Sequence, residues 1–209
     1  MIEKILPSTE TRLRILKIIY ENPEINLTML IKKAKTSPNI VLKYVNHLVE
    51  FNVIEEKRFG GKKKTHIRNL KANLLSSISI LVFSFVEIEK KLILLKKYKE
   101  IRPFVDQLVE LFNEKVNFCL IYGSFARLAA DKDSDLDIWI AGDLNAEMRK
   151  RISEIFSTLG REYSIKIEGL DMFLKNINNP IHQNMLQEHV VIYDEANFLK
   201  ILAKANKKL

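Results

Sequence analysis

Apolar residues recur every three or four positions in three stretches near the N-terminus, and this spacing predicts three helices. The predicted helices cover about residues 9–22, 27–35 and 38–51. Ser8 or Thr9 can cap the first helix, and Asn22-Pro23 ends it. Ser37-Pro38 is a strong start signal for the third, because serine caps helices and proline is favoured at their first position.

The pattern changes after the third helix. Residues 53–57 and 65–68 are short stretches rich in β-formers, and a turn at Gly60-Gly61 separates them. They predict a β-hairpin with a lysine-rich tip. The N-terminal third of the chain is therefore expected to contain three helices followed by a hairpin.

A long helix is predicted next, from about residue 74 to residue 98. Its apolar residues are spaced four and three positions apart over three heptads, which is the seam of a coiled coil. The seam consists of Leu74, Ile78, Leu81, Phe85, Ile88, Leu92 and Leu95. The helix either pairs with its copy in a homodimer or packs inside its own chain, and the homodimer is the favoured alternative.

The second half of the chain alternates strands with helices. The apolar run from Val116 to Tyr122 predicts a buried strand, and residues 135–140 alternate polar and apolar like a strand with two different faces. Further helices are predicted at 104–112, 145–159, 170–176, 181–188 and 195–203, and further strands at 163–168 and 190–193. This order predicts an α+β protein with a small mixed sheet.

Charge is unevenly distributed. Residues 1–72 contain 15 Lys and Arg and 7 Asp and Glu, an excess of 8, whereas residues 73–209 contain 19 of each. The basic excess points to a polyanion as the partner of the first domain. A single cysteine, the lack of a signal-peptide pattern and the lack of an uncharged run of about 18 residues favour a cytoplasmic protein away from membranes.

Two carboxylates on one face of a strand indicate a metal site. Asp135 and Asp137 are two positions apart, so their side chains point the same way. They repel each other unless a cation lies between them, and Mg²⁺ prefers oxygen ligands. Gly123-Ser124, at the end of the preceding strand, allows close approach of a ligand and offers N–H groups and a hydroxyl to a phosphate.

These residues resemble a known signature. Gly123-Ser124 with Phe125-Ala126-Arg127, followed by Asp133-Ser134 and Asp135-x-Asp137, is similar to the motif of the minimal nucleotidyltransferases of the DNA polymerase β-like superfamily. The resemblance covers about residues 103–197. It implies transfer of a nucleoside monophosphate from a nucleoside triphosphate, with Mg²⁺ (or Mn²⁺) as cofactor and pyrophosphate leaving. Asp135 and Asp137 would be the catalytic metal ligands, and Gly123, Ser124 and Arg127 would bind the nucleotide.

The chain departs from that family in two places. Leu128 follows Arg127 where the family usually has glycine. The family also has a third carboxylate on a later strand, and Glu168 is the candidate for this catalytic metal ligand, with Lys166 on the same face. If Lys166 is the equivalent position instead, the third ligand is missing.

Residues 9–70 resemble the winged helix-turn-helix domains of archaeal and bacterial transcription regulators. The resemblance implies that the third helix enters the major groove of DNA, and RNA is an alternative partner. The expected base-reading residues are Asn39, Lys43, Tyr44 and Asn46. The expected phosphate-binding residues are Lys57, Arg58, Lys62, Lys63, Lys64 and Arg68.

Taken together, the sequence predicts an α+β protein of three parts. These are a winged helix-turn-helix domain (1–72), a long linking or dimerisation helix (73–102) and a nucleotidyltransferase-like domain (103–209). Two functions remain open. The protein is either a DNA-binding nucleotidyltransferase with an unknown acceptor, or a transcription regulator or antitoxin-like protein whose transferase fold only binds nucleotide or a partner.

Overall fold

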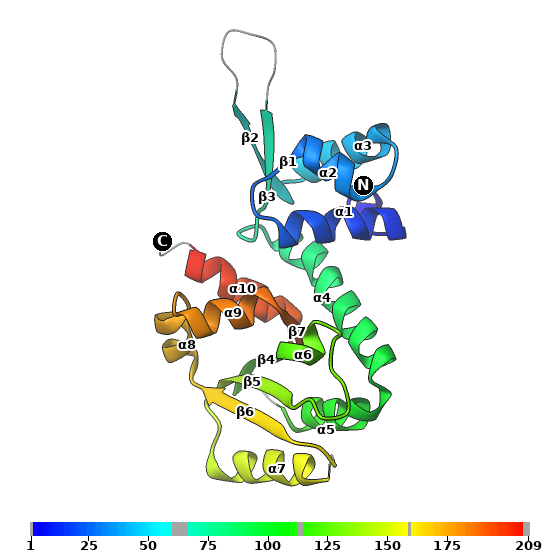
Figure 1. Ribbon diagram of the computed structural model, residues 1–209. Helices are drawn as coiled ribbons and strands as arrows, with labels where there is room; N and C mark the ends of the chain where they lie inside the picture. Colours follow the sequence, from blue (N-terminus) through cyan, green and yellow to red (C-terminus); the bar gives the residue numbers. More distant parts are fainter. Residues whose placement is uncertain (1, 60–66, 113–114, 159, 207–209) are drawn as a thin grey trace. The chain divides into compact units, whose positions relative to one another are not determined.

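The computed structural model describes residues 2–59, 67–112, 115–158 and 160–206. The chain divides into two compact units, Met1–Val86 and Glu87–Leu209. The long helix α4 (Ser77–Lys97) is shared between them, so the linking helix expected between two domains is part of both units (Figure 1). No helix among the described residues is long and apolar enough to cross a membrane.

The N-terminal unit has the three helices that the apolar spacing predicts. They are α1 (Glu10–Glu21), α2 (Leu27–Ala34) and α3 (Pro38–Glu50), and a short 3₁₀ helix, η1 (Ile2–Lys4), precedes them. Thr9 caps α1 by accepting a hydrogen bond from the backbone N–H of Arg12, at 3.3 Å. Asn26 caps α2 in the same way.

A three-stranded antiparallel sheet completes this unit. The two strands of the predicted hairpin, β2 (Ile54–Phe59) and β3 (Ile67–Ala72), pair along their whole length. A short strand that the sequence pattern did not reveal, β1 (Ile25–Asn26), pairs with the other edge of β3. Leu70 of β3 is fully buried, so the sheet closes the core that the three helices form.

The N-terminal half of α4 packs into the N-terminal unit through one face only. Val82, Phe83 and Val86 are completely buried, and Phe83 stacks on Tyr20 of α1 with ring centroids 5.5 Å apart. Ser79 donates a hydrogen bond to the backbone carbonyl of Val53, at 2.8 Å. The seam residues of this half of the helix, Ile78, Leu81 and Phe85, are exposed on another side.

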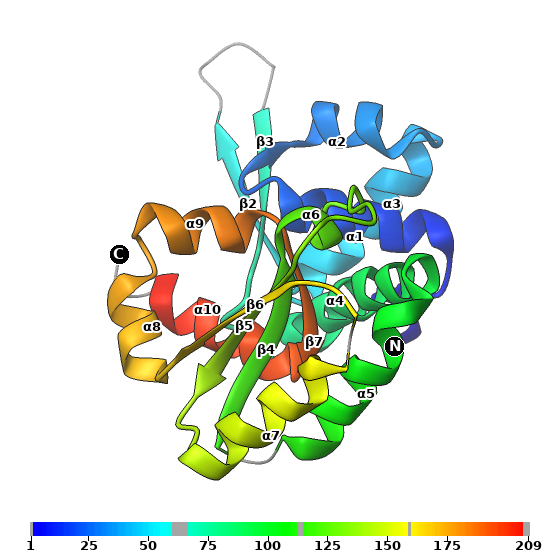
Figure 2. The ribbon, with the colours of Figure 1, turned by 60° about the horizontal axis from the view of Figure 1, so that its bottom comes forward.

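The C-terminal unit is built on a four-stranded mixed sheet, as the sequence predicts. Its strands are β4 (Val116–Tyr122), β5 (Leu136–Gly142), β6 (Tyr163–Glu168) and β7 (His189–Tyr193). Their order is β6-β5-β4-β7, with β5 and β6 parallel and the other two pairs antiparallel (Figure 2). The two central strands, β4 and β5, are almost entirely buried.

Helices cover both faces of this sheet. On one face, Ile121, Ile138 and Ile140 belong to a core cluster that includes side chains of α5 (Arg102–Leu111) and α7 (Ala146–Ser157). On the other face, Phe118 contacts Phe173 and Phe198 edge to face, at 5.0 and 5.1 Å between centroids. The covering helices there are α8 (Leu170–Asn176), α9 (Pro180–Gln187) and α10 (Glu195–Asn206), and η2 (Lys99–Ile101) precedes α5. Each fully buried large apolar side chain stabilises the fold by about 1.5–3 kcal/mol.

Candidate active site

Gly123 places the backbone directly against a carboxylate. Strand β4 ends at Tyr122, and the short helix α6 (Gly123–Ala126) begins at once. Gly123 has φ +71°, and a Cβ atom at this position would lie 2.5 Å from Oδ2 of Asp137. Any side chain here would therefore displace that carboxylate, and the positive φ also favours glycine. The sequence predicts close approach of a ligand at Gly123, and the structure shows close approach to the Asp137 carboxylate.

Asp137 is the better enclosed member of the carboxylate pair. It lies near the start of β5, opposite Tyr122 on one side and Ser164 on the other. Asp135 precedes the strand and is exposed. Burial raises the pKa of Asp137, the negative charge of Asp135 raises it further, and Arg127 lowers it. The two carboxylates are thus close enough to interact, as their spacing predicts.

Tyr122 lines the same corner. Burial and the charge of Asp137 raise the pKa of its hydroxyl, and a hydrogen bond with Ser164 lowers it. Tyr122, Asp137 and Ser164 therefore form one polar row across three strands, β4, β5 and β6. The sequence pattern did not single out Tyr122 or Ser164, because only the strand register brings them beside Asp137.

Arg127 interacts with two acidic groups. Its Nη1 lies 2.7 Å from Oε2 of Glu188, and both side chains are about half exposed. Its positive charge also reaches Asp137. Glu188 comes directly before β7, which is the strand next to β4. The sequence pattern gave Glu188 no role. The guanidinium is thus held beside the carboxylate pair by an ion pair that water partly screens.

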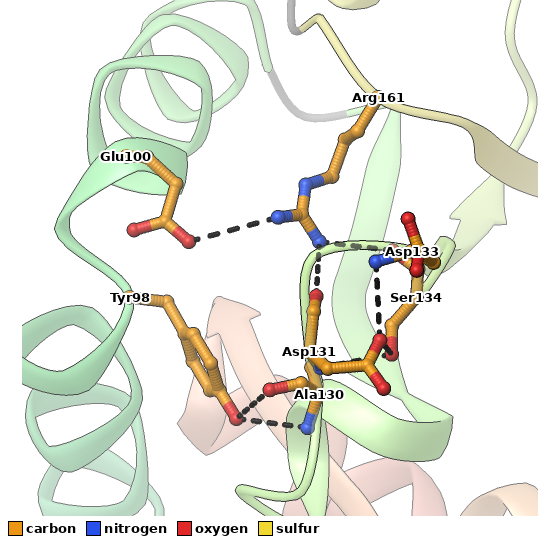
Figure 3. A network of polar contacts seen from close by, with 7 residues as sticks. All are labelled: Tyr98, Glu100, Ala130, Asp131, Asp133, Ser134 and Arg161. Carbon is orange, nitrogen blue, oxygen red and sulfur yellow. Dashed lines mark hydrogen bonds and ion pairs between the residues drawn. The ribbon is translucent and has the colours of Figure 1, made fainter.

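The loop that carries Asp135 is held by a polar network (Figure 3). Arg161 donates to the backbone carbonyl of Ser134, at 2.9 Å, and Tyr98 accepts a hydrogen bond from the backbone N–H of Ala130, also at 2.9 Å. Inside the loop, Ser134 donates to Oδ1 of Asp131 and accepts from the backbone N–H of that residue. Hydrogen bonds to Ser134 and to the backbone lower the pKa of Asp131. These contacts constrain the residues immediately before Asp135.

Glu168, the expected third carboxylate, does not join the pair. Ser164, not Glu168, lies opposite Asp137, and Glu168 is paired with Ala141, about 13 Å further along the strand. Nε2 of His182 lies 2.9 Å from one of its oxygens, and Asn176 donates to the other at 3.1 Å. The proposed metal-ligand role of Glu168 is corrected on this ground. Its side chain instead joins β6 to the helices above it.

Lys166 lies between Ser164 and Glu168 on the same face of β6. It shares the face of Ser164, lies opposite Trp139, and places its Nζ 3.8 Å from the centre of the Trp139 ring. The three side chains of β6 on this face therefore offer no carboxylate to Asp137. Among the described residues, no group of three or more His, Cys, Asp and Glu side chains is arranged to hold a metal ion.

Leu128 has a backbone conformation that favours glycine, the residue usually found at this position in the nucleotidyltransferases that the sequence resembles. Its φ is +58°, in the left-handed region, which costs a residue with a side chain about 1–2 kcal/mol. Its backbone carbonyl accepts a hydrogen bond from Lys97, and its side chain packs on the core cluster. The leucine thus combines a strained backbone with apolar packing.

We expect Leu128→Gly to be more stable than Leu128→Ala by about 0.5–1 kcal/mol, because both lose the packing and only glycine relieves the backbone. Urea unfolding of the two variants measures the difference. Leu111 at the end of α5 packs on the same cluster and is the matched control. There alanine should be the more stable by about 1 kcal/mol. If the alanine variant were more stable than the glycine variant at both positions, backbone strain at Leu128 would be ruled out.

One expected base-reading residue is wrong. Tyr44 on α3 is buried, its hydroxyl donates to the backbone carbonyl of Ile5 at 2.7 Å, and Arg12 lies over its ring. Burial raises the pKa of this hydroxyl. Tyr44 therefore attaches the N-terminal segment to α3 and does not face a ligand. Asn39, Lys43 and Asn46 are exposed on the same helix, as expected.

Three of the expected phosphate-binding residues already have an anionic partner. Arg58 and Arg68 both contact Glu56, whose pKa is lowered chiefly by its hydrogen bond with Arg68. Arg68 also donates to Asn46 of α3, at 3.2 Å. Lys57 lies 3.2 Å from Glu24. The predicted phosphate contacts of Lys62, Lys63 and Lys64 lie outside the described residues.

Residues in the second half of the chain are similar to known proteins. Residues 106–197 match the family model described as "Polymerase beta, Nucleotidyltransferase", and this segment contains Gly123, Asp135 and Asp137. A Methanocaldococcus jannaschii protein named "Putative protein adenylyltransferase" is 29% identical to this chain over 99 residues, which cover 46% of this chain and 96% of that protein. The matches support nucleotidyl transfer as the chemistry of this site, and residues 106–197 are similar to nucleotidyltransferase domains of the polymerase β type.

Proposed function

We propose that the C-terminal unit transfers a nucleoside monophosphate from a nucleoside triphosphate to an acceptor, with Mg²⁺ (or Mn²⁺) as cofactor. The observation that carries this proposal is the contact between Gly123 and Asp137. This contact places the turn that follows β4 directly beside the Asp137 carboxylate, so a phosphate bound by the turn would lie next to a metal ion held by that carboxylate. The family match over residues 106–197 supports the same chemistry.

The donor groups fit a hard divalent cation. Asp135 and Asp137 are two neighbouring carboxylates, and Mg²⁺ in phosphoryl-transfer sites is commonly bound by one or two carboxylates together with substrate phosphates. The backbone of Gly123 lies directly against Oδ2 of Asp137, where a Cβ atom would clash at 2.5 Å, so phosphates bound at this turn would lie beside the carboxylate. When bound, the metal would neutralise charge on the phosphates and orient them.

Other residues of the chain would bind and orient the triphosphate. Gly123 and Ser124 offer backbone N–H groups and a hydroxyl to the triphosphate, and Arg127 adds a positive charge beside it. The acceptor's hydroxyl oxygen forms a bond to the α-phosphorus as the bond to pyrophosphate breaks. The acceptor loses its proton to solvent or to a neighbouring base. Because α6 and the loop before Asp135 are held by hydrogen bonds, these groups are positioned in advance.

The relative from Methanocaldococcus jannaschii suggests the donor and the acceptor. Its printed name describes transfer of adenylate to protein. We therefore propose ATP as the donor and a protein hydroxyl as the acceptor.

The test is incubation of the purified protein with each α-³²P-labelled nucleoside triphosphate, Mg²⁺ and a cell extract. Label from ATP in a protein band is the expected result. Label in nucleic acid would keep the transfer reaction but change the acceptor. Absence of labelled product with all four nucleotides would overturn the proposed reaction.

A second function is favoured by one observation. Ser164 and Lys166, rather than a carboxylate, lie nearest to Asp137 on β6. A site that lacks a third carboxylate is suited to binding a nucleotide without activating an acceptor. In that case the protein would bind ATP and Mg²⁺ as a regulatory or antitoxin-like protein. Mg²⁺-dependent ATP binding without any labelled product would favour this function over transfer.

We further propose that the N-terminal unit is a winged helix-turn-helix domain that binds DNA. The three helices followed by an antiparallel hairpin are the elements this kind of domain requires, and the exposed side chains of Asn39, Lys43 and Asn46 lie along α3. The formal excess of 8 positive charges in residues 1–72 favours a polyanion. RNA would satisfy the same charge, so duplexes of both kinds belong in the test.

We expect Lys43→Ala to weaken binding to duplex DNA and to reduce the slope of log K against log salt by about one, because one positive charge that faces the DNA is lost. Fluorescence anisotropy at several salt concentrations measures this. Tyr44→Phe is the matched control on the same helix. It should leave the slope unchanged and lower the stability of the protein by about 1 kcal/mol, since only an internal hydrogen bond is lost. An unchanged slope for Lys43→Ala would remove α3 from the interface.

A further inference from the structure

Helix α4 exposes a continuous row of large apolar side chains. Ile78, Leu81 and Phe85 lie on the part of the helix that belongs to the N-terminal unit, and Ile88 and Leu92 lie on the part that belongs to the C-terminal unit. Their exposed fractions are 41%, 50%, 39%, 37% and 61%. We call these five residues the apolar stripe. Leu75 and Ile93, which are also exposed, extend its edges.

The apolar stripe is not the face through which α4 packs inside its own chain. At 100° per residue its members fall within an arc of about 80°. The opposite arc is the one that each unit buries, with Ile80 and Phe83 in the N-terminal unit and Glu87 and Leu94 in the C-terminal unit. Packing inside the chain therefore uses the other face of α4. Of the seven predicted seam residues, the five in the stripe are exposed, whereas Leu95 packs on the core cluster of the C-terminal unit and Leu74 is partly buried.

Isolated exposed apolar residues are ordinary, but a contiguous row is not. With about 200 Å² of accessible surface for a large apolar side chain, the stripe and its two edge residues expose roughly 600 Å². This is at the upper end of the largest patch found on a typical monomer. It also approaches the roughly 800 Å² that each partner contributes to a stable protein interface.

We propose that the apolar stripe is a homodimer interface, with α4 of one protomer packed against α4 of its partner. The spacing of four and three positions keeps the stripe facing a second helix over its whole length, which is the geometry of a coiled coil. An identical stripe on a second copy is self-complementary in size and spacing, so a two-fold pair buries both at once. A nucleic acid would not satisfy this surface, because the stripe carries no charge.

The interface is independent of the proposed reaction and of DNA binding. Its test needs neither nucleotide nor nucleic acid, so failure of the dimer and failure of the proposed function are separate results. We expect light scattering coupled to size exclusion to report twice the protomer mass of 24.4 kDa at micromolar concentrations. A thermal midpoint that rises with protein concentration should accompany it.

Leu81→Asp/Phe85→Asp places four charges in the proposed interface of each dimer. We expect its dissociation constant to rise about a hundredfold or more, and the mass to fall to that of the protomer. Met29→Asp/Ile181→Asp is the matched control, because these two side chains are exposed to a similar extent, at 47% and 60%, away from the stripe. The control should remain a dimer.

Circular dichroism separates dissociation from unfolding. If the Asp variant loses helix content, Leu81→Ser/Phe85→Ser is the milder replacement, and sedimentation equilibrium measures its weaker association. A wild type with the mass of one protomer would overturn the proposal and leave the stripe for a different partner. A dimer that survives both the Asp and the Ser variants would place the interface elsewhere and overturn it equally.

Discussion

Replacing Asp135 and Asp137 together by asparagine is expected to reduce transfer of labelled nucleotide by about a thousandfold or more. The variant keeps the size and most hydrogen bonds of both side chains but removes the two negative charges that would hold Mg²⁺. The fold should remain intact, because Asp135 is exposed and Asp137 is in part relieved of repulsion from its neighbour. Initial rates with α-³²P-labelled ATP, together with urea unfolding, measure the two effects.

Asp133→Asn is the matched control for this variant. Asp133 lies in the same loop, is exposed, and contributes only its backbone N–H to the network in Figure 3, as a donor to Asp131 at 3.1 Å. It should transfer nucleotide at the wild-type rate. Equal rates for all three proteins would show that the carboxylate pair takes no part in the reaction. A loss of activity in Asp133→Asn would instead assign the effect to the loop.

Glu87→Ala is expected to destabilise the C-terminal unit by about 3–5 kcal/mol, the usual cost of removing one partner from a buried ion cluster. Glu87 on α4 is completely buried. Nζ of Lys90 lies 3.1 Å from its carboxylate, and Nε2 of His189 lies 3.3 Å from Oε1. Without the carboxylate, both groups remain in an apolar surrounding with no anion. Urea unfolding followed by tryptophan fluorescence reports on this unit, because Trp139, the protein's single tryptophan, lies on β5.

Glu110→Ala on α5 is the control for this prediction. Glu110 is exposed, so its loss should change the free energy of unfolding by less than about 0.5 kcal/mol. Similar effects of the two substitutions would mean that the buried cluster adds little to stability.

The same cluster makes a prediction for acid. Burial raises the pKa of Glu87, but the charges and hydrogen bonds of His189 and Lys90 lower it to about 2, below its usual value of 4.5. The stabilisation is therefore complete above about pH 4.5 and is lost as the pH falls from there towards 2. The difference in stability between the wild type and Glu87→Gln should shrink over that range. A constant difference would argue against an ionised Glu87.

Local patterns in the sequence predicted most of the helices and strands. The apolar run from Val116 to Tyr122 and the alternation after Asp135 are patterns within single segments, so the sequence alone can reveal them. Both predicted strands are present as β4 and β5. Strand β6 and helix α8 have the bounds that the sequence predicts. At Gly123 the structure shows close approach of the backbone to the Asp137 carboxylate, and ligand binding there stays a prediction.

Register between strands was not available from the sequence. Glu168 and Ser164 share one face of β6, and the alternation of side chains cannot say which of them lies beside Asp137. The choice is made by how β6 pairs with β5, and that pairing places Ser164 there. The ion pair of Arg127 with Glu188 has the same origin, because 61 residues separate the two in sequence.

Burial of single residues on a helix was also decided by tertiary contacts. Tyr44 is a residue type that can contact DNA bases, and its place on α3 suggested that role. Its hydroxyl instead donates a hydrogen bond to the backbone carbonyl of Ile5, 39 positions earlier in the sequence. On α4 the sequence showed an apolar seam and left open which face the chain itself would bury. The structure buries Phe83 and Leu94 on the opposite face and leaves five of the seven heptad residues exposed, while Leu95 packs on the core of the C-terminal unit.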